Sequence, residues 1–535
     1  MRRTILAAAL TALTLGSPAC SFSLDFPQCR NKDDCDKGDD GPVQTCAENH
    51  RCVDATDLPC ESNEACAADF GDDFVCGVDK TCVNALSAEC RAVHWPSDTS
   101  RDKVVFVGSI IPVNPPYDAI TVPLQNAIDL AVGDFNTTTE LQGGRKVAWV
   151  ECDDGGRPDK AVDAAKHLTG TLGAPAILGP VFSEAVLKIA QDVTIPADTF
   201  VITPTASSEQ ITTLNDKNLV WRTVPSDVYQ TSALRDYILA LDPLPASLVI
   251  LAKDDAYGNG ILAGLVDPVG VLPKVGAFRY PDPTSFATGE ELLASYGAII
   301  GQVFGTAPDT ILIIGTSEAA NLIAGYIQAW NLQNPPPPLP RIILSHGAVP
   351  TMELAVEQFS SPDQMALREA LISLVKATSP IIQDPNNFAG FNIRYSIRFA
   401  NLEPLTTASL SYDAALVTML AMATVKGDEA ITGAKIAAGM TSLVDKAGVK
   451  VSFGGNDVAF IKTARDTLVA GATVDLEGVS GPLDFDLATG EVRANLIGWD
   501  LVAKDGTTDV PVIHQDQIYI LNPEPSVDGV WMDLP

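Results

Sequence analysis

The chain has 535 residues, which is enough for about two to four domains, and its formal net charge at pH 7 is −32. This charge disfavours nucleic acid and anionic membrane surfaces as partners, because both are bound by clustered Lys and Arg. The hydrophobic content of 46% is sufficient for a buried core. No apolar run after residue 20 is long enough to span a bilayer.

The first 20 residues have the pattern of an export signal. Two arginines precede an apolar run over residues 5–15, which is followed by small residues and then Cys20. We expect residues 1–19 to be a signal peptide, and Cys20 to be acylated so that residues 20–28 tether the protein to the cell envelope. Ordinary cleavage after Ala19 is the alternative. Acylation is favoured because the chain has 11 cysteines, and acylation of Cys20 leaves an even number that can pair.

Residues 29–90 form a Cys-rich repeat. Four cysteines that begin at Cys29 return with nearly the same spacing 31 residues later. Few large apolar residues lie here, so disulfides must replace a core, although spacing does not give their connectivity. Zinc is the alternative, but the CxxC pairs of zinc sites are missing, so we expect no metal. If each repeat closes on itself, Cys90 pairs with Cys152; pairing across the repeats is equally compatible with the sequence.

Residues 91–102 are polar and are predicted to form a linker, after which strand and helix patterns alternate. The predicted strands are 104–107, 147–150, 176–178, 200–202, 248–251, 311–314 and 342–344. The predicted helices include 124–135, 161–168, 184–193 and 319–330. This alternation indicates a doubly wound α/β fold with largely parallel sheets. Such folds bind ligands at the carboxyl ends of strands, here in the loops after residues 178, 202, 314 and 344.

Seven segments occur in an order that points to one family. They are VAWVECDDGGRPDKAVDAAKHL (147–168), AILGPVFSEAV (176–186), VITPTASSEQI (201–211), LVWRTVPSDVYQTSAL (219–234), LVILAKDDAYGNG (248–260), LSYDAAL (410–416) and GVSGPLDFDLATGEV (478–492). Together they resemble the leucine/isoleucine/valine-binding type of ABC-transporter substrate-binding protein. The resemblance implies a type I periplasmic clamshell, in which two doubly wound lobes are joined by three crossovers. Mapped onto this chain, lobe one comprises 103–226 and 396–476, lobe two comprises 227–395 and 477–510, and 511–535 is a C-terminal tail.

The resemblance places a ligand seat in lobe one. Ser183 matches the serine that holds the ligand carboxylate, and Thr205, Ala206 and Ser207 match a second seat of backbone groups and a hydroxyl. A hydroxyl beside free N–H groups at a helix start suits an anion. The alternative is helix capping, by Ser183 as an N-cap and by Ser207 with Gln210 as a capping box.

Lobe two departs from the family pattern. Thr316 or Ser317 stands where the family has an aromatic residue, and His346 lies near the position of the acidic residue that pairs with a ligand ammonium. A buried ammonium without such a partner is costly, so an ordinary α-amino acid ligand does not follow from the resemblance alone. Tyr117, in the first loop, and Tyr257, opposite the cleft, complete the candidate ligand contacts. For Tyr117, packing within its loop is the alternative.

No HExxH, GxSxG or P-loop motif occurs, and the five histidines are scattered, so we expect neither an enzyme nor a bound cofactor. The expected function is capture of a small polar molecule (an amino acid, an amide or a similar carboxylate) for import by an ABC permease. The expected location is the cell envelope, on the periplasmic side or the cell surface. The alternatives are a ligand sensor or envelope scaffold outside transport, and an adhesion role for the Cys-rich repeat.

Overall fold

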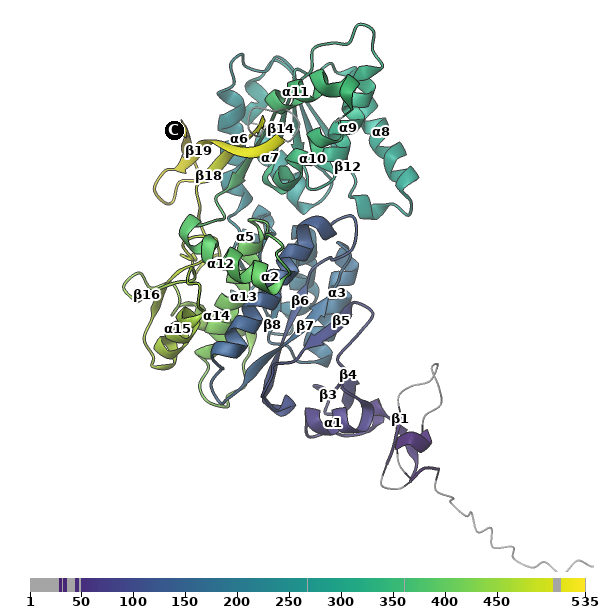
Figure 1. The fold of residues 1–535 in the computed structure, drawn as a ribbon, viewed down its shortest axis with the longest axis vertical. Helices are drawn as coiled ribbons and strands as arrows, with labels where there is room; N and C mark the ends of the chain where they lie inside the picture. The colour runs from purple at the N-terminus through teal and green to yellow at the C-terminus, as the bar shows by residue number, and fades with distance from the viewer. Residues whose placement is uncertain are drawn as a thin grey trace, which may run out of the picture.

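The computed structural model describes residues 28–30, 32–35, 44–47, 50–266, 268–359, 361–503 and 511–534. The expected signal peptide, Cys20 and the tether up to residue 27 lie outside the described residues. Two α/β lobes are stacked along the long axis, and a Cys-rich extension lies beside the end of lobe one (Figure 1). Within the described ranges no helix has the length and apolar content needed to cross a membrane.

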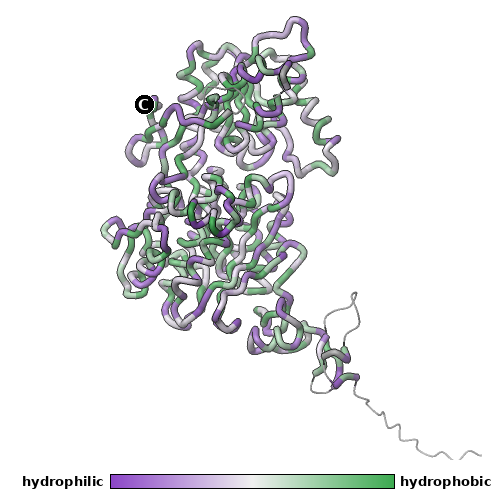
Figure 2. Tube along the Cα trace, viewed as in Figure 1, coloured by the Kyte–Doolittle hydropathy of each residue, from purple (hydrophilic) through white to green (hydrophobic). Residues whose placement is uncertain are grey.

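Lobe one contains a six-stranded sheet in the order β10-β9-β8-β6-β7-β5. Its parallel strands are β6 (Val104–Ile110), β7 (Lys146–Cys152), β8 (Ala176–Leu178), β9 (Phe200–Thr203) and β10 (Val220–Arg222). These strands are almost continuously apolar, as expected for a sheet whose two faces are both covered by helices. Hydrophobic residues run through the middle of the lobe (Figure 2). The helices are α2 (Asp118–Thr138), α3 (Pro158–Lys166), α4 (Ser183–Ile189), α5 (Glu209–Thr212), α12 (Pro385–Arg398), α13 (Ala408–Ala423), α14 (Gly433–Met440) and α15 (Ala459–Val469).

Helix α13 is buried along its whole length, between α2, α14 and α15. Asp413 lies in the middle of this helix, so it is not a helix cap. Its carboxylate accepts hydrogen bonds from the backbone N–H groups of Val479 (2.9 Å) and Ser480 (2.7 Å) and from the Ser480 hydroxyl. A short pair of parallel strands, β16 (Val449–Ser452) and β17 (Val474–Glu477), lies beside α15. Asp413 thus fastens the segment after β17 to the core of lobe one.

Lobe two contains an eight-stranded sheet in the order β12-β11-β13-β14-β15-β18-β19-β20. Its strands are β11 (Leu248–Lys253), β12 (Val275–Tyr280), β13 (Thr310–Ile314), β14 (Arg341–Leu344), β15 (Val375–Pro380), β18 (Leu496–Ala503), β19 (Pro511–Leu521) and β20 (Gly529–Asp533). The helices are α6 (Asp227–Leu239), α7 (Ala256–Val266), α8 (Gly289–Gly305), α9 (Ala319–Asn331), α10 (Met352–Glu357) and α11 (Met365–Leu374). Strands β11 to β15 are parallel, whereas β18 to β20 are antiparallel.

The described part of the expected C-terminal tail, residues 511–534, is not a tail, because β19 and β20 extend the sheet of lobe two. Tyr519 is fully buried, and Trp531 donates a 3.0 Å hydrogen bond from its indole nitrogen to the Ala233 carbonyl of α6. Inward aromatic residues alternate with exposed Ile520, Val530 and Met532, which is the pattern of antiparallel strands with one covered face.

The lobe boundaries also differ from those mapped by resemblance. The core of lobe one includes Phe391 and Tyr395 of α12, together with Val479 and Phe485. The chain therefore crosses between lobes near residues 223–226, 381–384 and 493–495, and the segments 385–395 and 477–493 are part of lobe one. The family segments locate strands and loops, but the side on which α12 packs depends on contacts with α2 that are distant in sequence.

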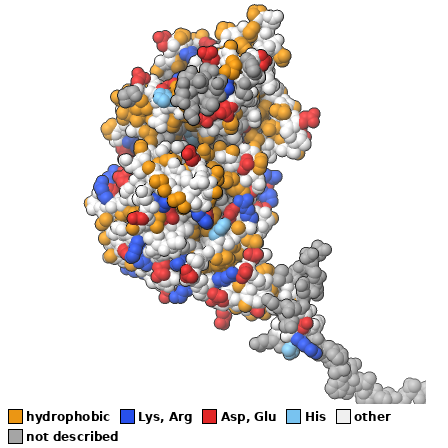
Figure 3. Space-filling view, viewed as in Figure 1, with side chains coloured by type: hydrophobic (Ala, Val, Ile, Leu, Met, Phe, Trp, Pro, Cys, Tyr) orange, Lys and Arg blue, Asp and Glu red, His pale blue; other side chains and the backbone are white. Residues whose placement is uncertain are grey.

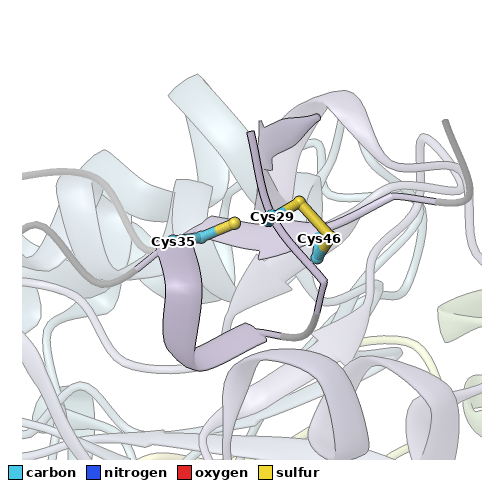
Figure 4. A group of neighbouring side chains, drawn as sticks. All are labelled: Cys29, Cys35 and Cys46. Atoms are coloured by element: carbon cyan, nitrogen blue, oxygen red, sulfur yellow. A yellow bond between two sulfur atoms is a disulfide. The ribbon is translucent and has the colours of Figure 1, made fainter. Parts of the chain in front are cut away.

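The Cys-rich extension is held by disulfides within each repeat. The pairs are Cys29–Cys46, Cys35–Cys52, Cys60–Cys76 and Cys66–Cys82. The sulfur atoms of Cys29, Cys35 and Cys46 lie within 4.8 Å of one another (Figure 4), a spacing that also suits a metal. Because the Cys29–Cys46 and Cys35–Cys52 bonds consume these thiols, the oxidised repeat offers no thiolate at this point. The extension includes β1 (Gln44–Cys46), β2 (Cys52–Asp54), α1 (Asn63–Phe70), β3 (Phe74–Cys76) and β4 (Cys82–Asn84).

The second repeat is joined firmly to lobe one. Val75 and Ala85 share a hydrophobic core with helices of that lobe, and Lys160 forms a 2.6 Å ion pair with Glu89. Strand β5 (Cys90–His94) occupies part of the expected linker and pairs with β7, and the disulfide Cys90–Cys152 joins the same two strands. The clamshell and the second repeat are therefore one folded unit.

Candidate functional site

A cavity of about 90 Å³ lies between the lobes, and we call it the inner cavity. It lies at the carboxyl ends of the parallel strands, where the loops after β8, β9, β13 and β14 meet. Six of the nine predicted ligand contacts line it: Ser183, Thr205, Ser207, Tyr257, Thr316 and His346. Apolar side chains make up much of the remaining wall: Ile120, Leu124, Val181, Phe182 and Pro350.

Hydroxyl groups supply the polar part of the lobe-one wall of the inner cavity. Ser183 is the first residue of α4, and its hydroxyl accepts a 3.2 Å hydrogen bond from the Ser208 backbone N–H, which leaves the hydroxyl hydrogen for a ligand. The Thr205 hydroxyl donates to the Val181 carbonyl at 2.9 Å and retains its lone pairs. Both capping alternatives are wrong in detail, because α4 is preceded by Phe182 and the side chain that caps α5 is that of Ser208.

His346 and Tyr257 form the lobe-two wall. The Tyr257 hydroxyl donates to the Ser345 hydroxyl at 2.8 Å and lies 3.4 Å from Nδ1 of His346. On the other side, Nε2 of His346 lies 3.3 Å from the hydroxyl of Ser207, which connects the two lobes. Burial lowers the pKa of His346 to about 4, so the imidazole is neutral at pH 7.

Asp227 lies behind His346 and is only 2% exposed. Its Oδ1 atom is 3.8 Å from Nδ1 of His346, and neither carboxylate oxygen accepts a hydrogen bond of ordinary geometry from the described residues. Burial raises the pKa of Asp227 to about 7. Ser207, His346 and Asp227 follow the order of a hydrolase triad, but 3.8 Å is beyond hydrogen-bond distance, so His346 is not oriented as a catalytic base requires.

Two charged residues of the site, Lys253 and Asp255, were not predicted. Among the residues that the structure describes, Asp255 is the one carboxylate that lines the inner cavity. It is already paired: its Oδ2 lies 3.6 Å from the ammonium of Lys253, which is 1% exposed, and its Oδ1 accepts a 2.8 Å bond from the Gly258 N–H. Lys253 ends β11, so the rule that ligands bind at the carboxyl ends of strands could have drawn attention to this segment.

Tyr117 does not line the inner cavity but joins the lobes beside it. Its hydroxyl donates to Asp282, and its ring lies 4.7 Å from that of Phe182. The ammonium of Lys253 is 2.6 Å from Asp282, 5.3 Å from the Tyr117 ring and 4.9 Å from the Phe182 ring. The carboxylate and the two aromatic faces offset the free-energy cost of burying the Lys253 ammonium.

Ala206 and Ser317 also lie outside the inner cavity. Ala206 is buried, and its N–H donates to the Thr203 hydroxyl within its own loop. Ser317 lines a second, adjoining cavity of about 430 Å³ between the lobes, which we call the outer cavity. The outer cavity also contains Glu318, whose carboxylate accepts bonds from the backbone N–H of Thr316 (2.9 Å) and the hydroxyl of Tyr280 (2.9 Å).

The comparison with known proteins decides the family. The sequence model of the periplasmic binding protein family matches residues 104–381, which is more than half of the chain. The chain belongs to the periplasmic binding protein family. The predicted α/β clamshell is thereby confirmed, and the disulfides confirm the disulfide-rich module in front of it. A search of curated proteins finds no match.

Several solved structures of solute-binding proteins, some of them from ABC transporters, have the same fold. A leucine-binding protein, LivK, from Thermotoga maritima is 16% identical with a TM-score of 0.55, and the match covers 77% of this chain and 98% of that one. A solute-binding protein from Rhodopseudomonas palustris, in complex with 3,4-dihydroxybenzoic acid, has 16% identity, a TM-score of 0.55 and coverages of 79% and 99%. LivJ from Streptococcus pneumoniae, in complex with isoleucine, has 18% identity, a TM-score of 0.51 and coverages of 77% and 100%. At these identities the likeness establishes the fold of this periplasmic binding protein.

Proposed function

We propose that this protein is an exported, lipid-anchored solute-binding protein that captures a small polar molecule between its lobes for ABC-type import. The observation that carries the proposal is the inner cavity, which is walled by both lobes at the carboxyl ends of their strands. A ligand that contacts both walls stabilises the closed arrangement by its difference in affinity for the closed and open forms. A ligand with a micromolar dissociation constant, about −8 kcal/mol, can produce such a shift when most of that free energy comes from contacts made only in the closed form.

The polar end of the ligand is either a carboxylate, which accepts from the hydroxyls of Ser183 and Ser207, or an amide, whose N–H also donates to the Thr205 hydroxyl. The ligands named for the structural neighbours, which are leucine, isoleucine and 3,4-dihydroxybenzoate, all carry a carboxylate. Asp255, the one carboxylate among the described residues that line the cavity, lies 3.6 Å from the Lys253 ammonium, so a ligand ammonium would compete with Lys253 for it. The neutral His346 supplies a hydrogen bond instead of a charge.

Calorimetry tests this proposal with leucine, benzoate, 3,4-dihydroxybenzoate and acetamide as probes. We expect saturable binding of at least one probe, and at least tenfold weaker binding in Ser183→Ala. The matched control is Ser373→Ala, which removes an exposed hydroxyl from α11, far along the chain from the site. Absence of binding by every probe, or equal loss in the two variants, would contradict the proposal.

A second candidate is a ligand sensor or envelope scaffold that uses the same fold outside transport. Two observations favour it: the contacts of Tyr117 and Lys253 join the lobes through side chains alone, and the second Cys-rich repeat is fused rigidly to lobe one. The candidates differ in one measurable property. Import requires ligand-dependent closure, so a radius of gyration that is compact and unchanged by any ligand favours the scaffold.

A further inference from the structure

The inner cavity is small for the ligands that clamshell proteins hold. Its volume is about 90 Å³, whereas an engineered cavity of about 150 Å³ accommodates a single benzene molecule. Typical ligand pockets enclose roughly 300–1,000 Å³. The inner cavity therefore has room for a polar head group but not for a whole organic solute of ordinary size.

The outer cavity supplies the missing space. It measures about 430 Å³ and is also formed by both lobes, with Ala119 and Leu405 from lobe one and Pro283, Leu292 and Leu354 from lobe two. Its lining is largely apolar, and Leu354 is 54% exposed. Binding of an apolar group here would be favourable, because it would remove apolar surface of both the group and the cavity from water.

Two apolar side chains separate the cavities. Ile120, on α2 of lobe one, and Pro350, in the loop after β14 of lobe two, line both the inner and the outer cavity. Because the two residues belong to different lobes, a small change in the angle between the lobes alters the gap between them. The hydroxyls of Ser183, Thr205 and Ser207 lie on the inner side of this partition. The polar side chains on the outer side are those of Ser317, Glu318, Asn321, Thr351 and Gln358.

We infer that the ligand of this protein is an elongated amphiphile, with a polar head in the inner cavity and an uncharged apolar chain that passes between Ile120 and Pro350 into the outer cavity. This inference rests on the proposed function and narrows it to acyl-chain or arylalkyl solutes. An apolar chain suits the outer cavity better than a charged one, because the carboxylate of Glu318 is already satisfied by Thr316 and Tyr280.

The test is a chain-length series. Straight-chain carboxylates and straight-chain 2-amino acids, each from about four to twelve carbons, are titrated into the full chain below their micellar concentrations. We expect the dissociation constant in at least one series to fall by roughly fourfold for each added methylene once the chain passes Ile120, as burial of one methylene predicts. The gain ends when the outer cavity is full.

Variants of the outer cavity identify where the chain lies. Ala119→Trp, at an exposed position of α2, fills the outer cavity, and Leu354→Asp makes its exposed wall polar. In both variants the dissociation constant should no longer fall as the chain lengthens. The shortest ligand should bind within about twofold of its wild-type affinity. Thr137→Trp, at an exposed position near the other end of α2, is the control and should retain the gain.

The outcomes separate this inference from the function on which it rests. If short probes bind and affinity does not increase with chain length, or if both outer-cavity variants retain the gain, the inference is overturned and the proposed capture function stands. If no member of either series binds, the proposed function is overturned together with the inference.

Discussion

The phenolic hydroxyl of Tyr117, in lobe one, donates a 2.7 Å hydrogen bond to the Asp282 carboxylate, in lobe two. The ammonium of Lys253 contacts the same carboxylate, so one buried cluster joins the lobes next to the inner cavity. The two lobes are thus joined by side chains of the protein itself.

Replacement of Tyr117 by Phe should loosen the closed form. A hydrogen bond to a charged group contributes about 2 kcal/mol, so the ratio of closed to open molecules should fall roughly 30-fold. Small-angle scattering of the ligand-free protein would then give a larger radius of gyration. The control is Tyr395→Phe, because the hydroxyl of Tyr395 bonds Asn126 within lobe one. An unchanged radius in Tyr117→Phe would show that the bond does not hold the lobes together.

Glu491→Gln should weaken both folding and ligand binding. Glu491 neutralises the fully buried Arg222, which also donates a 2.9 Å bond to the Ser208 carbonyl and so supports the loop that carries Ser207. Loss of one partner of a buried ion pair costs about 3–5 kcal/mol. Urea unfolding should record this loss, whereas Asp192→Asn, which removes an exposed pair with Lys188, should cost less than about 1 kcal/mol.

Asp227→Asn should change how stability depends on pH. The folded-state pKa of Asp227 is about 7, whereas the unfolded chain titrates near 3.8. Between these values the folded protein binds the extra proton, so stabilisation by Asp227 is complete below about pH 4 and is lost as pH rises to 7, by up to about 4 kcal/mol. The variant lacks this loss, so its free energy of unfolding relative to wild type should be higher at pH 8 than at pH 4.5.

His346 changes the pH dependence of stability in the opposite direction to Asp227. It is present in both the wild type and Asp227→Asn. Its folded-state pKa of about 4 lies below the ordinary 6.5, so its contribution grows as pH rises from 4 to 6.5. The difference between Asp227→Asn and wild type therefore isolates the carboxyl group, apart from coupling within the pair. Asp254→Asn, at an exposed carboxylate, serves as the control. Parallel pH profiles for Asp227→Asn and wild type would contradict the assignment.

Cys20→Ser should release the protein from the membrane if Cys20 is acylated as proposed. Detergent-phase partitioning of the wild-type protein and the intact mass of its mature N-terminus measure the lipid directly. We expect the wild type in the detergent phase and Cys20→Ser in the aqueous phase. A wild-type N-terminus at an unmodified residue 20 would favour the alternative of ordinary cleavage after Ala19.

The parallel strands and the location of the cavity could be predicted because each depends on local sequence. Apolar runs such as 248–251 predict buried strands, and polar residues that follow them mark the ligand-binding edge of the sheet. The approach of Asp227 to His346 could not be predicted, because α6 and the loop after β14 are far apart in the sequence. The burial of Lys253 could not be predicted either. The groups that offset the cost of burying its charge are Asp282 and two aromatic rings of the other lobe, which are distant in sequence.

Acidic and basic side chains are interspersed over the surface in view (Figure 3). On this face the acidic excess of the chain, which has a net charge of −32, is not gathered into one patch. The charges that matter for the site, on Lys253, Asp255 and Asp282, are instead hidden between the lobes.

The bond between Cys90 and Cys152 has a mechanical consequence. A pull on the N-terminal end of the chain enters lobe one through this disulfide and the β5–β7 ladder, and the load spreads into the sheet. The three crossovers between the lobes are not part of this β5–β7 connection. Tension on the N-terminus therefore does not act directly on the angle between the lobes. If the chain is anchored at its N-terminal end as proposed, tension on the anchor would load the sheet of lobe one and not the contacts between the lobes.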